Sequence, residues 1–490
     1  MISGRLKMGL CAALALAAGL VLRFWFVTHA ARIDGDTLIY GNIARNWLQH
    51  GVYGFTQTTR GITPTLIRLP GYPLFLAVCF AFFGLDHYIA VMYVQCVIDL
   101  LTCVLVAALA HRLFGPRAAM AALWLGALCP FTAAYAAAPL TETLTLASIT
   151  LTFYAVERWC VAGWRAGGTG FNRWLWVAAA AMAYSLLLRP EQGLLAAAVI
   201  PAMLWMALKS SKQPPLTLDD SHPAEQLPAP HILQRRPSLR AVTPVPLAAL
   251  CILLPLAPWA LRNWRTFHVL QPLAPRFATD PGETVPVGFQ RWYRTWAIDY
   301  ASTEEVYWKY DSAQIDIANL PNRAFDNDDQ YARTAALLAD YNETDNATPQ
   351  LDARFAALAR ERIHADPIRY YIALPVARLL DMAFRPRAEM LPISLDWWTW
   401  REHRRETEFA TLFAALNLAY FVAGAVGLWL WHRRGWGQDS PLAWSMFAFV
   451  LLRCALLLTL DNSEPRYTLE FFPLLVLWAS AAVHPALKTD

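Results

Sequence analysis

The chain has 490 residues, 57% hydrophobic and 16% charged, and its formal net charge is +4. A soluble domain is about half apolar and about a quarter charged, so this composition excludes an ordinary soluble protein. The small positive charge fits basic loops at a membrane surface and does not suggest a nucleic-acid partner. The eight cysteines lie in or beside apolar runs without metal-ligand spacing, so we expect core residues and neither disulfides nor ligands.

Long apolar runs recur along the chain, and many approach the roughly 20 residues that a helix needs to cross a bilayer. The longer runs are residues 9–30, 88–110, 118–138, 243–261, 409–431, 442–460 and 469–483. The shorter candidates are residues 144–156, 174–188 and 193–208. Basic residues in short loops mark the cytoplasmic side of a membrane. The pattern predicts an all-α integral membrane protein, a polytopic helical bundle of about ten or more spans with both termini inside.

Two apolar segments, residues 72–84 and 368–384, are too short to cross. If the first crossed, the later basic loops would face outward, so we expect both to be juxtamembrane helices near the outer surface. The long polar stretch at residues 262–408 predicts a mainly helical extracytoplasmic insertion. Within it, Thr348-Pro349 is typical of a helix start, with proline at the first helical position.

Three parts of the chain follow from this topology. They are residues 1–261, an N-terminal transmembrane core with an outer loop at residues 31–87, then residues 262–408, the insertion, and residues 409–490, the C-terminal transmembrane helices. Residues 209–242 are rich in proline and mixed charge, and we expect a cytoplasmic linker there.

The same topology places charged and polar residues from distant parts of the chain on the outer side. They are Asp34, Asp36, Arg68, Glu142, Arg189, Glu191, Arg262, Asn263, Glu464, Arg466 and Tyr467. Charged side chains beside lipid are costly and need a reason beyond anchoring. We therefore interpret the outer ends of the spans as a candidate site.

Acidic residues open two of these outer segments. Asp34 and Asp36 directly follow the first apolar run, where a carboxylate can serve as a general base for a hydroxyl group. Alternatively, they cap the helix that begins near Leu38. Glu142 opens a later span, where it would orient an acceptor or hold a cation, or else interact with the helix dipole.

Arginines are the second part of the candidate site. The candidates for binding a phosphate are Arg68, Arg189, Arg262 and Arg466. Arginine recognises phosphate with its planar fork, but each residue taken alone is also explained as an interface anchor. Asp99 and Arg453 lie inside spans at similar depths, and we expect them to form a buried ion pair. The histidines show no ligand spacing, so a metal site cannot be identified from the sequence.

The motifs occur in a specific order along the chain. They are Asp36-x-x-x-Tyr40, Arg68-x-Pro70-Gly71-Tyr72-Pro73, Leu140-Thr141-Glu142, Leu188-Arg189-Pro190, Pro258-Trp259-x-x-Arg262-Asn263 and Arg466-Tyr467. This order and spacing resembles bacterial GT-C glycosyltransferases, and most nearly the protein O-mannosyltransferase and lipid A aminoarabinose transferase superfamily. The chain departs from that pattern at Leu69-Pro70, where the family often has two prolines. It also has Ile67 where many relatives carry a residue suited to metal binding.

The resemblance implies a sugar donor linked to polyprenyl phosphate and transfer on the outer face. It implies Asp36 as the catalytic base and Glu142 as a second acidic site residue, with Asp34 beside Asp36 and Arg68 near the donor phosphate. The residues expected to line the substrate pocket are Tyr40, Tyr72, Asn263 and Tyr467.

We expect an inverting glycosyltransferase of the bacterial inner membrane, with its active site facing outside and membrane lipids around it. The acceptor hydroxyl would belong to a lipid, a protein or a glycan. The sequence identifies no definite cofactor, and it leaves open whether the site holds a divalent metal ion. The alternative is a transporter or flippase of lipid-linked sugar. Such proteins tend to show internal repeats and broken mid-membrane helices, and the sequence suggests neither.

Overall fold

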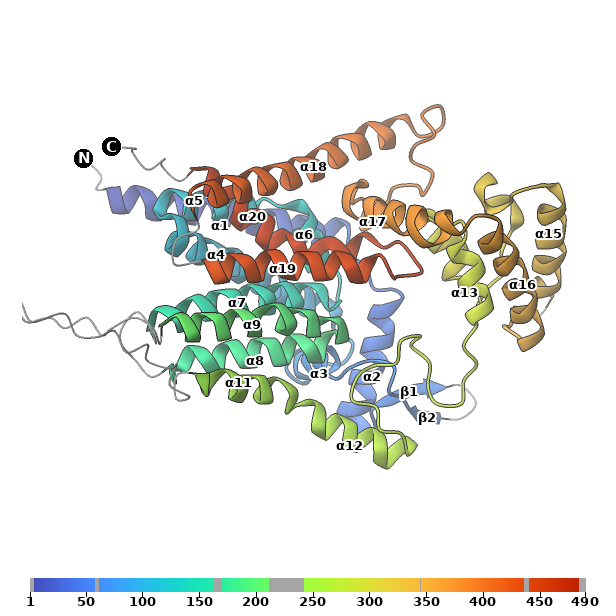
Figure 1. Cartoon of the computed structure of the whole chain (residues 1–490), viewed down its shortest axis with the longest axis horizontal. Helices are drawn as coiled ribbons and strands as arrows, with labels where there is room; N and C mark the ends of the chain where they lie inside the picture. The colour runs from blue at the N-terminus through green and yellow to red at the C-terminus, as the bar shows by residue number, and fades with distance from the viewer. Residues whose placement is uncertain are drawn as a thin grey trace, which may run out of the picture.

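A computed structural model describes residues 4–57, 61–162, 170–210, 242–343, 345–435 and 440–483. Long, roughly aligned helices form a bundle, and the insertion projects from one end of it (Figure 1). The first helix begins and the last helix ends at the opposite end of the bundle (Figure 1). The predicted linker at residues 209–242 lies almost wholly outside the described residues.

The bundle helices come from both halves of the chain. They are α1 (Gly4–His29), α4 (Tyr88–Phe114), α5 (Pro116–Ala127), α6 (Pro130–Ala136), α7 (Glu142–Cys160), α8 (Arg173–Leu188), α9 (Gly193–Ser210), α11 (Pro244–Leu253), α12 (Leu256–Phe267), α18 (Arg404–Arg433), α19 (Ser440–Leu457) and α20 (Phe472–Ser480). Their buried faces form one continuous core that includes Phe131, Phe153 and Trp159. Large apolar side chains such as Leu412 and Val21 remain exposed on the outside of the bundle, as a lipid-facing surface requires.

Six helices among the described residues are long and apolar enough to cross a membrane, or seven if α5 and α6 count as one bent span. The axes of α5 and α6 differ by 54°, and Pro130 begins the second helix. Proline has no amide hydrogen to continue the preceding helix, which explains the break. The mostly helical fold with membrane-spanning helices is therefore as predicted, whereas the count of about ten or more spans is not confirmed.

The loop after α1, predicted to lie on the outer side, forms a compact unit. It contains α2 (Asp36–His50), the antiparallel strands β1 (Gly54–Gln57) and β2 (Gly61–Pro64), and α3 (Gly71–Phe83). The predicted juxtamembrane segment at residues 72–84 is α3, which packs on α2 and α8. The approach to α8 is so close that a Cβ on Gly71 would lie 2.6 Å from the Leu187 carbonyl oxygen. Glycine at this position therefore fixes the loop that carries Arg68 against the bundle.

The insertion is mainly helical in its described residues, as the sequence predicts. Its elements are α13 (Val287–Arg294), α14 (Tyr300–Ser302), the π-helical turn η3 (Thr303–Tyr307), the short turns η4 (Ile317–Asn319) and η5 (Asn322–Ala324), α15 (Asp328–Asn342), α16 (Pro349–Ala365), the π-helical turn η6 (Arg369–Ala373) and α17 (Leu374–Phe384). Thr348 caps α16, with its hydroxyl accepting from the Leu351 amide at 3.2 Å. An aromatic core holds these helices together, and Phe289 and Tyr310 stack in it with ring centres 3.7 Å apart.

The second predicted juxtamembrane segment, residues 368–384, forms η6 and α17. Its apolar residues Ile368, Ile372 and Leu380 are each at least half exposed, whereas Arg378 is buried. Phe384 at the end of α17 contacts Phe421 of α18, with ring centres 5.1 Å apart. The exposed stripe of apolar side chains is typical of a helix that lies against lipid. The predicted division of the chain into three parts, at residues 261 and 408, stays a proposal.

The expected ion pair between Asp99 and Arg453 is wrong. Asp99 of α4 instead accepts from Arg23 of α1, with Nε at 2.8 Å. Arg453 of α19 lies 2.9 Å from Glu470. The position of a residue along its helix predicts its depth in the membrane but not the side chain that it faces. The sequence does not say which helices are adjacent.

Candidate active site

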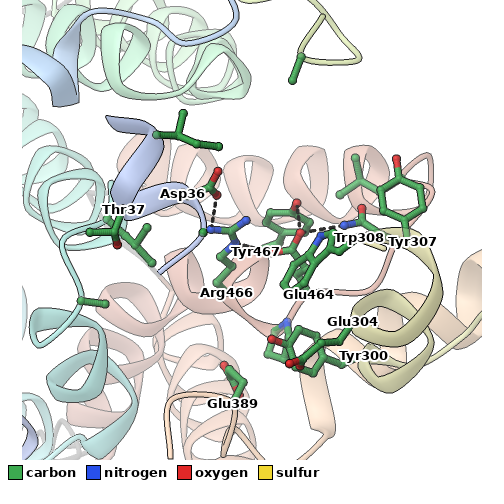
Figure 2. A pocket seen from close by; sticks show the side chains of 18 of the residues that line it. Asp36, Thr37, Tyr300, Glu304, Tyr307, Trp308, Glu389, Glu464, Arg466 and Tyr467 are labelled. Carbon is green, nitrogen blue, oxygen red and sulfur yellow. Dashed lines mark hydrogen bonds and ion pairs between the residues drawn. The ribbon is translucent and has the colours of Figure 1, made fainter. Parts of the chain in front are cut away.

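A cavity of about 1090 Å³ lies where the bundle meets the insertion, at the end predicted to face outside. Its walls come from the α1–α2 loop, the loop before α3, the start of the insertion, and the 3₁₀ helix η8 (Pro465–Phe471) with the loop that precedes it. Figure 2 shows Arg466 reaching from η8 towards Asp36 at the start of α2. These two residues are 430 positions apart in the sequence, and Arg466 donates a hydrogen bond to Asp36 at the wall of the cavity.

Asp36 is held by two arginines. Its Oδ1 atom accepts from Nη2 of Arg68 at 2.7 Å, and its Oδ2 atom accepts from Nη1 of Arg466 at 2.9 Å. Gly35, with φ of 45°, is the N-cap of α2, and no side chain caps this helix. The carboxylate of Asp36 is therefore directed to the arginines and the cavity and does not satisfy the helix amides.

The electrostatics keep these groups charged. Burial alone would raise the pKa of Asp36, but Arg466 and Arg68 outweigh it and hold the pKa well below its ordinary value. Burial would lower the pKa of Arg466, yet the carboxylates of Glu464 and Asp36 hold it well above its ordinary value. The pKa of Arg68 is raised in the same way, against the effect of burial, by Tyr40 and Asp36. Asp36 is thus an ionised carboxylate at neutral pH.

Glu464 supports Arg466 from the loop before η8, and the sequence analysis gave it no role. Its carboxylate accepts from Nε of Arg466, from the Tyr467 hydroxyl at 2.6 Å and from the Asn462 amide at 2.7 Å. An acid two residues before the arginine, across Pro465, is the signal that could have identified it. Glu464 fixes the direction of the guanidinium group that reaches Asp36.

Glu142 and Arg189 lie directly behind the cavity wall. Glu142 begins α7 and accepts from Nη1 of Arg189 at 3.2 Å, and its carboxylate lies 4.0 Å from Nε of Arg466. Arg189, which ends α8, also donates from Nε to Glu191 at 2.7 Å. Burial would lower the pKa of Arg189, but the surrounding carboxylates hold it well above its ordinary value. The structure therefore joins both predicted residues to Asp36 through Arg466.

Ion pairs extend this group into the bundle. Arg453 of α19 lies 2.9 Å from Glu470 and 3.5 Å from Glu191, and Glu470 lies 3.9 Å from Arg189. We call the whole set the outer charge network. Its members are Arg68, Arg189, Arg453, Arg466, Asp36, Glu142, Glu191, Glu464 and Glu470. The sequence did not predict Glu470 and Arg453 as members of this network. They join it because η8 lies beside α19 and α7 in the folded chain, which places Glu470 next to Arg453.

Arg262 and Asn263 lie outside the lining of this cavity. Arg262 donates to the backbone oxygens of Thr65 and Tyr53, both at 2.7 Å, and Asn263 donates to the Gln271 oxygen at 2.7 Å. The two bonds of Arg262 tie α12 to the loop that carries Arg68. In this structure Arg262 and Asn263 hold a loop in place, and their contact with substrate stays a prediction.

The predicted pocket tyrosines differ in position. Tyr467 lines the cavity. Tyr40 lies behind Arg68, whose guanidinium is 5.7 Å from its ring centre. Tyr72 is fully buried, packs edge-on against Tyr40 and donates to Gln95 at 2.7 Å. Tyr40 and Tyr72 therefore support the arginine from behind and do not face the cavity.

Asp34 lines the cavity but forms no ion pair with any described residue.

A metal ion at the predicted acids would need several ligand atoms close together. The one group of at least three His, Cys, Asp or Glu side chains with metal-like spacing in the described ranges is Asp396, Glu402 and His403. None of the predicted site residues belongs to it. The paired arginines of the cavity suit an anion better than a cation.

Residues 66–217 match the sequence family described as dolichyl-phosphate-mannose-protein mannosyltransferase. The matched segment contains Arg68, Glu142 and Arg189. This match confirms, over residues 66–217, the resemblance predicted from the motifs. No curated protein sequence matches the chain.

Solved structures with some likeness include two transferases. One is an archaeal oligosaccharyltransferase, AglB from Archaeoglobus fulgidus, in complex with an inhibitory peptide and a dolichol-phosphate, with 10% identity and a TM-score of 0.46. The likeness covers 98% of this chain and 50% of that one, so the chain spans about half its length. The other is ArnT from Cupriavidus metallidurans bound to undecaprenyl phosphate, with 15% identity, a TM-score of 0.38, and coverage of 98% of this chain and 78% of that one. TM-scores this low establish nothing about the site.

Proposed function

We propose that the protein is an inverting glycosyltransferase that moves a sugar from a polyprenyl phosphate to a hydroxyl acceptor on the outer face of the membrane. The observation that carries this proposal is the Asp36 carboxylate, ionised and held beside two guanidinium groups at a large cavity. A base and cations at one point are what transfer from a sugar phosphate requires. The matched family is itself named for a donor in which mannose is linked to dolichyl phosphate.

In the proposed reaction, Asp36 accepts the proton and the two arginines stabilise the negative charge. The acceptor oxygen forms a bond to the anomeric carbon as the bond from that carbon to the phosphate oxygen breaks, and Asp36 takes the hydroxyl proton. The electron pair of the broken bond stays on the lipid phosphate, which is already a stable anion, so no general acid is needed. Arg68 and Arg466 stabilise the charge that builds on the phosphate. A single displacement of this kind inverts the configuration of the anomeric carbon.

The orientation of the bundle supports an outward-facing site. Basic residues end the long helices at the end far from the cavity, including Arg112 of α4 and Arg433 of α18 (Figure 1). Basic loop residues favour the cytoplasmic side, which supports an outer position for the cavity. We place the protein in the bacterial inner membrane, with the acceptor being a lipid, a protein or a glycan that reaches the periplasmic surface.

The test is transfer by the purified protein from radiolabelled polyprenyl-phosphate sugars to a membrane extract, run beside Asp36→Asn. Asp86→Asn is the matched control, because Asp86 lies on the same outer surface and pairs with Arg45 at 2.7 Å but does not line the cavity. Asn is also suited to the positive φ of 57° at this position. We expect label in the acceptor with the unmodified protein and with Asp86→Asn, and none with Asp36→Asn.

Two results would contradict the proposal. Transfer that persists in Asp36→Asn would remove Asp36 as the base. Label that remains on the lipid with every variant, but moves across a vesicle membrane, would favour a transporter or flippase over a transferase.

A further inference from the structure

The Asp36 carboxylate occupies the position on two arginines where an anionic ligand could bind. Each of its carboxylate oxygens takes one guanidinium group, at 2.7 Å from Arg68 and 2.9 Å from Arg466. Two oxygens of a phosphate would bind the same pair of guanidinium groups in the same way. The side chains of Arg68 and Arg466 are 22% and 20% exposed, so both reach the cavity from which a ligand would arrive.

Every arginine of the outer charge network already has a carboxylate partner. The outer charge network joins the guanidinium groups of four arginines to the carboxylates of five acids, through the ion pairs given above. An added phosphate would therefore bring further negative charge to guanidinium groups that already have carboxylate partners. Charge repulsion in a partly dehydrated site is expensive, so a phosphate binds here only if a carboxylate gives way.

Asp36 is the carboxylate that can give way. Its side chain is 21% exposed and lines the cavity. The side chain of Glu191 is equally exposed but does not line the cavity, and those of Glu142, Glu464 and Glu470 are at most 4% exposed. A deeply buried carboxylate that lost its arginine would keep an unpaired charge in the interior, which is strongly unfavourable. Asp36 can turn into the cavity and keep contact with water or with an acceptor hydroxyl.

We propose that Asp36 holds the phosphate site of the donor in the absence of substrate, and that the donor phosphate displaces it from Arg68 and Arg466. This inference rests on the proposed function and deepens it. The displaced carboxylate is no longer held by the two guanidinium groups and becomes a stronger base at the moment when the donor is present. The donor then has to bind before the acceptor is activated, which protects an unloaded site from unproductive chemistry.

A rival position for the phosphate exists in the same cavity. Arg32 and Arg276 line it, and neither forms an ion pair with any described residue. A phosphate bound there would not compete with Asp36. The two positions predict opposite effects of Asp36 on binding, so a binding measurement separates them.

The experiment measures the affinity of the full-length protein in lipid nanodiscs for sugar-free polyprenyl phosphate and, in a parallel arm, for inorganic phosphate. A hydrogen bond to a charged group contributes enough that removing the competing carboxylate should tighten binding by about tenfold or more. We therefore expect Asp36→Asn to bind polyprenyl phosphate more tightly than the unmodified protein does. Asp36→Ser is the second variant, with the same expected direction, and Asp86→Asn is the control with unchanged affinity.

Further variants identify the site and the ligand. Arg68→Gln and Arg466→Gln should each weaken binding at least tenfold, and Arg276→Gln should not. Inorganic phosphate should displace the lipid at high concentration if the phosphate group alone is recognised. If it does not displace the lipid, the prenyl chain supplies the recognition and the displacement of Asp36 is tested on the lipid alone.

The outcomes separate this inference from the proposed function. Equal or weaker binding by both Asp36 variants, with the unmodified protein still binding the lipid phosphate, would overturn the displacement of Asp36 and leave the donor class intact. Loss of binding in Arg276→Gln would place the phosphate at the rival position. No binding of either phosphate by the unmodified protein or by any variant would overturn the donor class and the displacement together.

Discussion

Two sets of buried charges in this protein differ in what surrounds them. Arg23 and Asp99 form a closed pair between α1 and α4, and Arg23 also donates to the backbone oxygens of Gly19 and Ala127 at 2.9 and 2.7 Å. Both side chains are at most 3% exposed. In the outer charge network, by contrast, Arg68 and Arg466 keep a fifth of their side-chain surface open to a large cavity.

The difference separates structural from functional charge more clearly than the presence of charge does. An ionisable residue inside a membrane protein is a functional candidate by default. The guanidinium of Arg23 is enclosed by fixed acceptors of the protein, so a ligand finds no access there. The guanidinium groups beside Asp36 are bound by a carboxylate that a ligand can replace. The predictions below either sharpen this contrast or break it.

The largest expected effect is on turnover. Asp36→Asn should lower kcat by about 10²–10⁴-fold, because the amide cannot accept the hydroxyl proton, while the protein stays folded. The measurement is single-turnover transfer with saturating labelled donor, with the melting temperature as a check of folding. A fall in kcat that merely followed a fall in melting temperature would place Asp36 with the structural charges.

The closed pair should respond in the opposite way. Asp99→Ala would leave Arg23 charged and unpaired in the bundle and should cost about 3–5 kcal/mol of stability. The combined change Arg23→Met and Asp99→Leu should recover most of that loss, because an apolar pair of similar size needs no partner. Thermal unfolding in detergent measures both. Full stability of Asp99→Ala alone would show that the pair is not enclosed as described.

A change at Arg466 tests the cavity side of the contrast. Arg466 meets Asp36, Glu464 and Glu142 with one planar group. Lysine carries the same charge but cannot reach these carboxylates together, so Arg466→Lys should lower turnover about 10–100-fold with little change in folding. Arg369→Lys, in a surface pair with Asp326 at 2.8 Å, is the matched control and should leave turnover unchanged. Equal turnover of Arg466→Lys and the unmodified protein would mean that only the charge matters.

The sequence predicted one half of this contrast and missed the other. Topology alone placed Asp36, Glu142 and Arg466 on one face, because loop position follows from apolar run length and basic residues. The structure brings them within hydrogen-bond or ion-pair reach of one another or of a shared arginine. The Arg23–Asp99 pair was missed, because contacts between helices depend on which faces meet, and one sequence does not encode that in a readable way. The same limit left Glu470 unassigned.

The pH dependence gives a smaller effect. The arginines hold the pKa of Asp36 well below its ordinary value of about 3.9, so its stabilising contribution is present above that value and is lost only in strong acid. We expect kcat/KM, which reports the free enzyme, to show no loss from Asp36 between pH 7 and about pH 5. Arg68→Gln should raise the pKa of Asp36 and move the acid limb to higher pH. An acid limb at the same pH in both proteins would show that Arg68 does not hold the carboxylate.

The smallest effect is expected for a pair that resembles Asp36 and Arg68 in chemistry but not in surroundings. Arg45 and Asp86 lie 2.7 Å apart on the same outer surface, and both side chains are more than a third exposed. Water screens such a pair, so Asp86→Asn should change stability by less than about 1 kcal/mol. Thermal unfolding at low and high salt measures it, and the small difference from the unmodified protein should shrink further at high salt. A loss as large as that of Asp99→Ala would mean that access to water does not decide the role of a charge here, and the contrast between the two buried sets would fail with it.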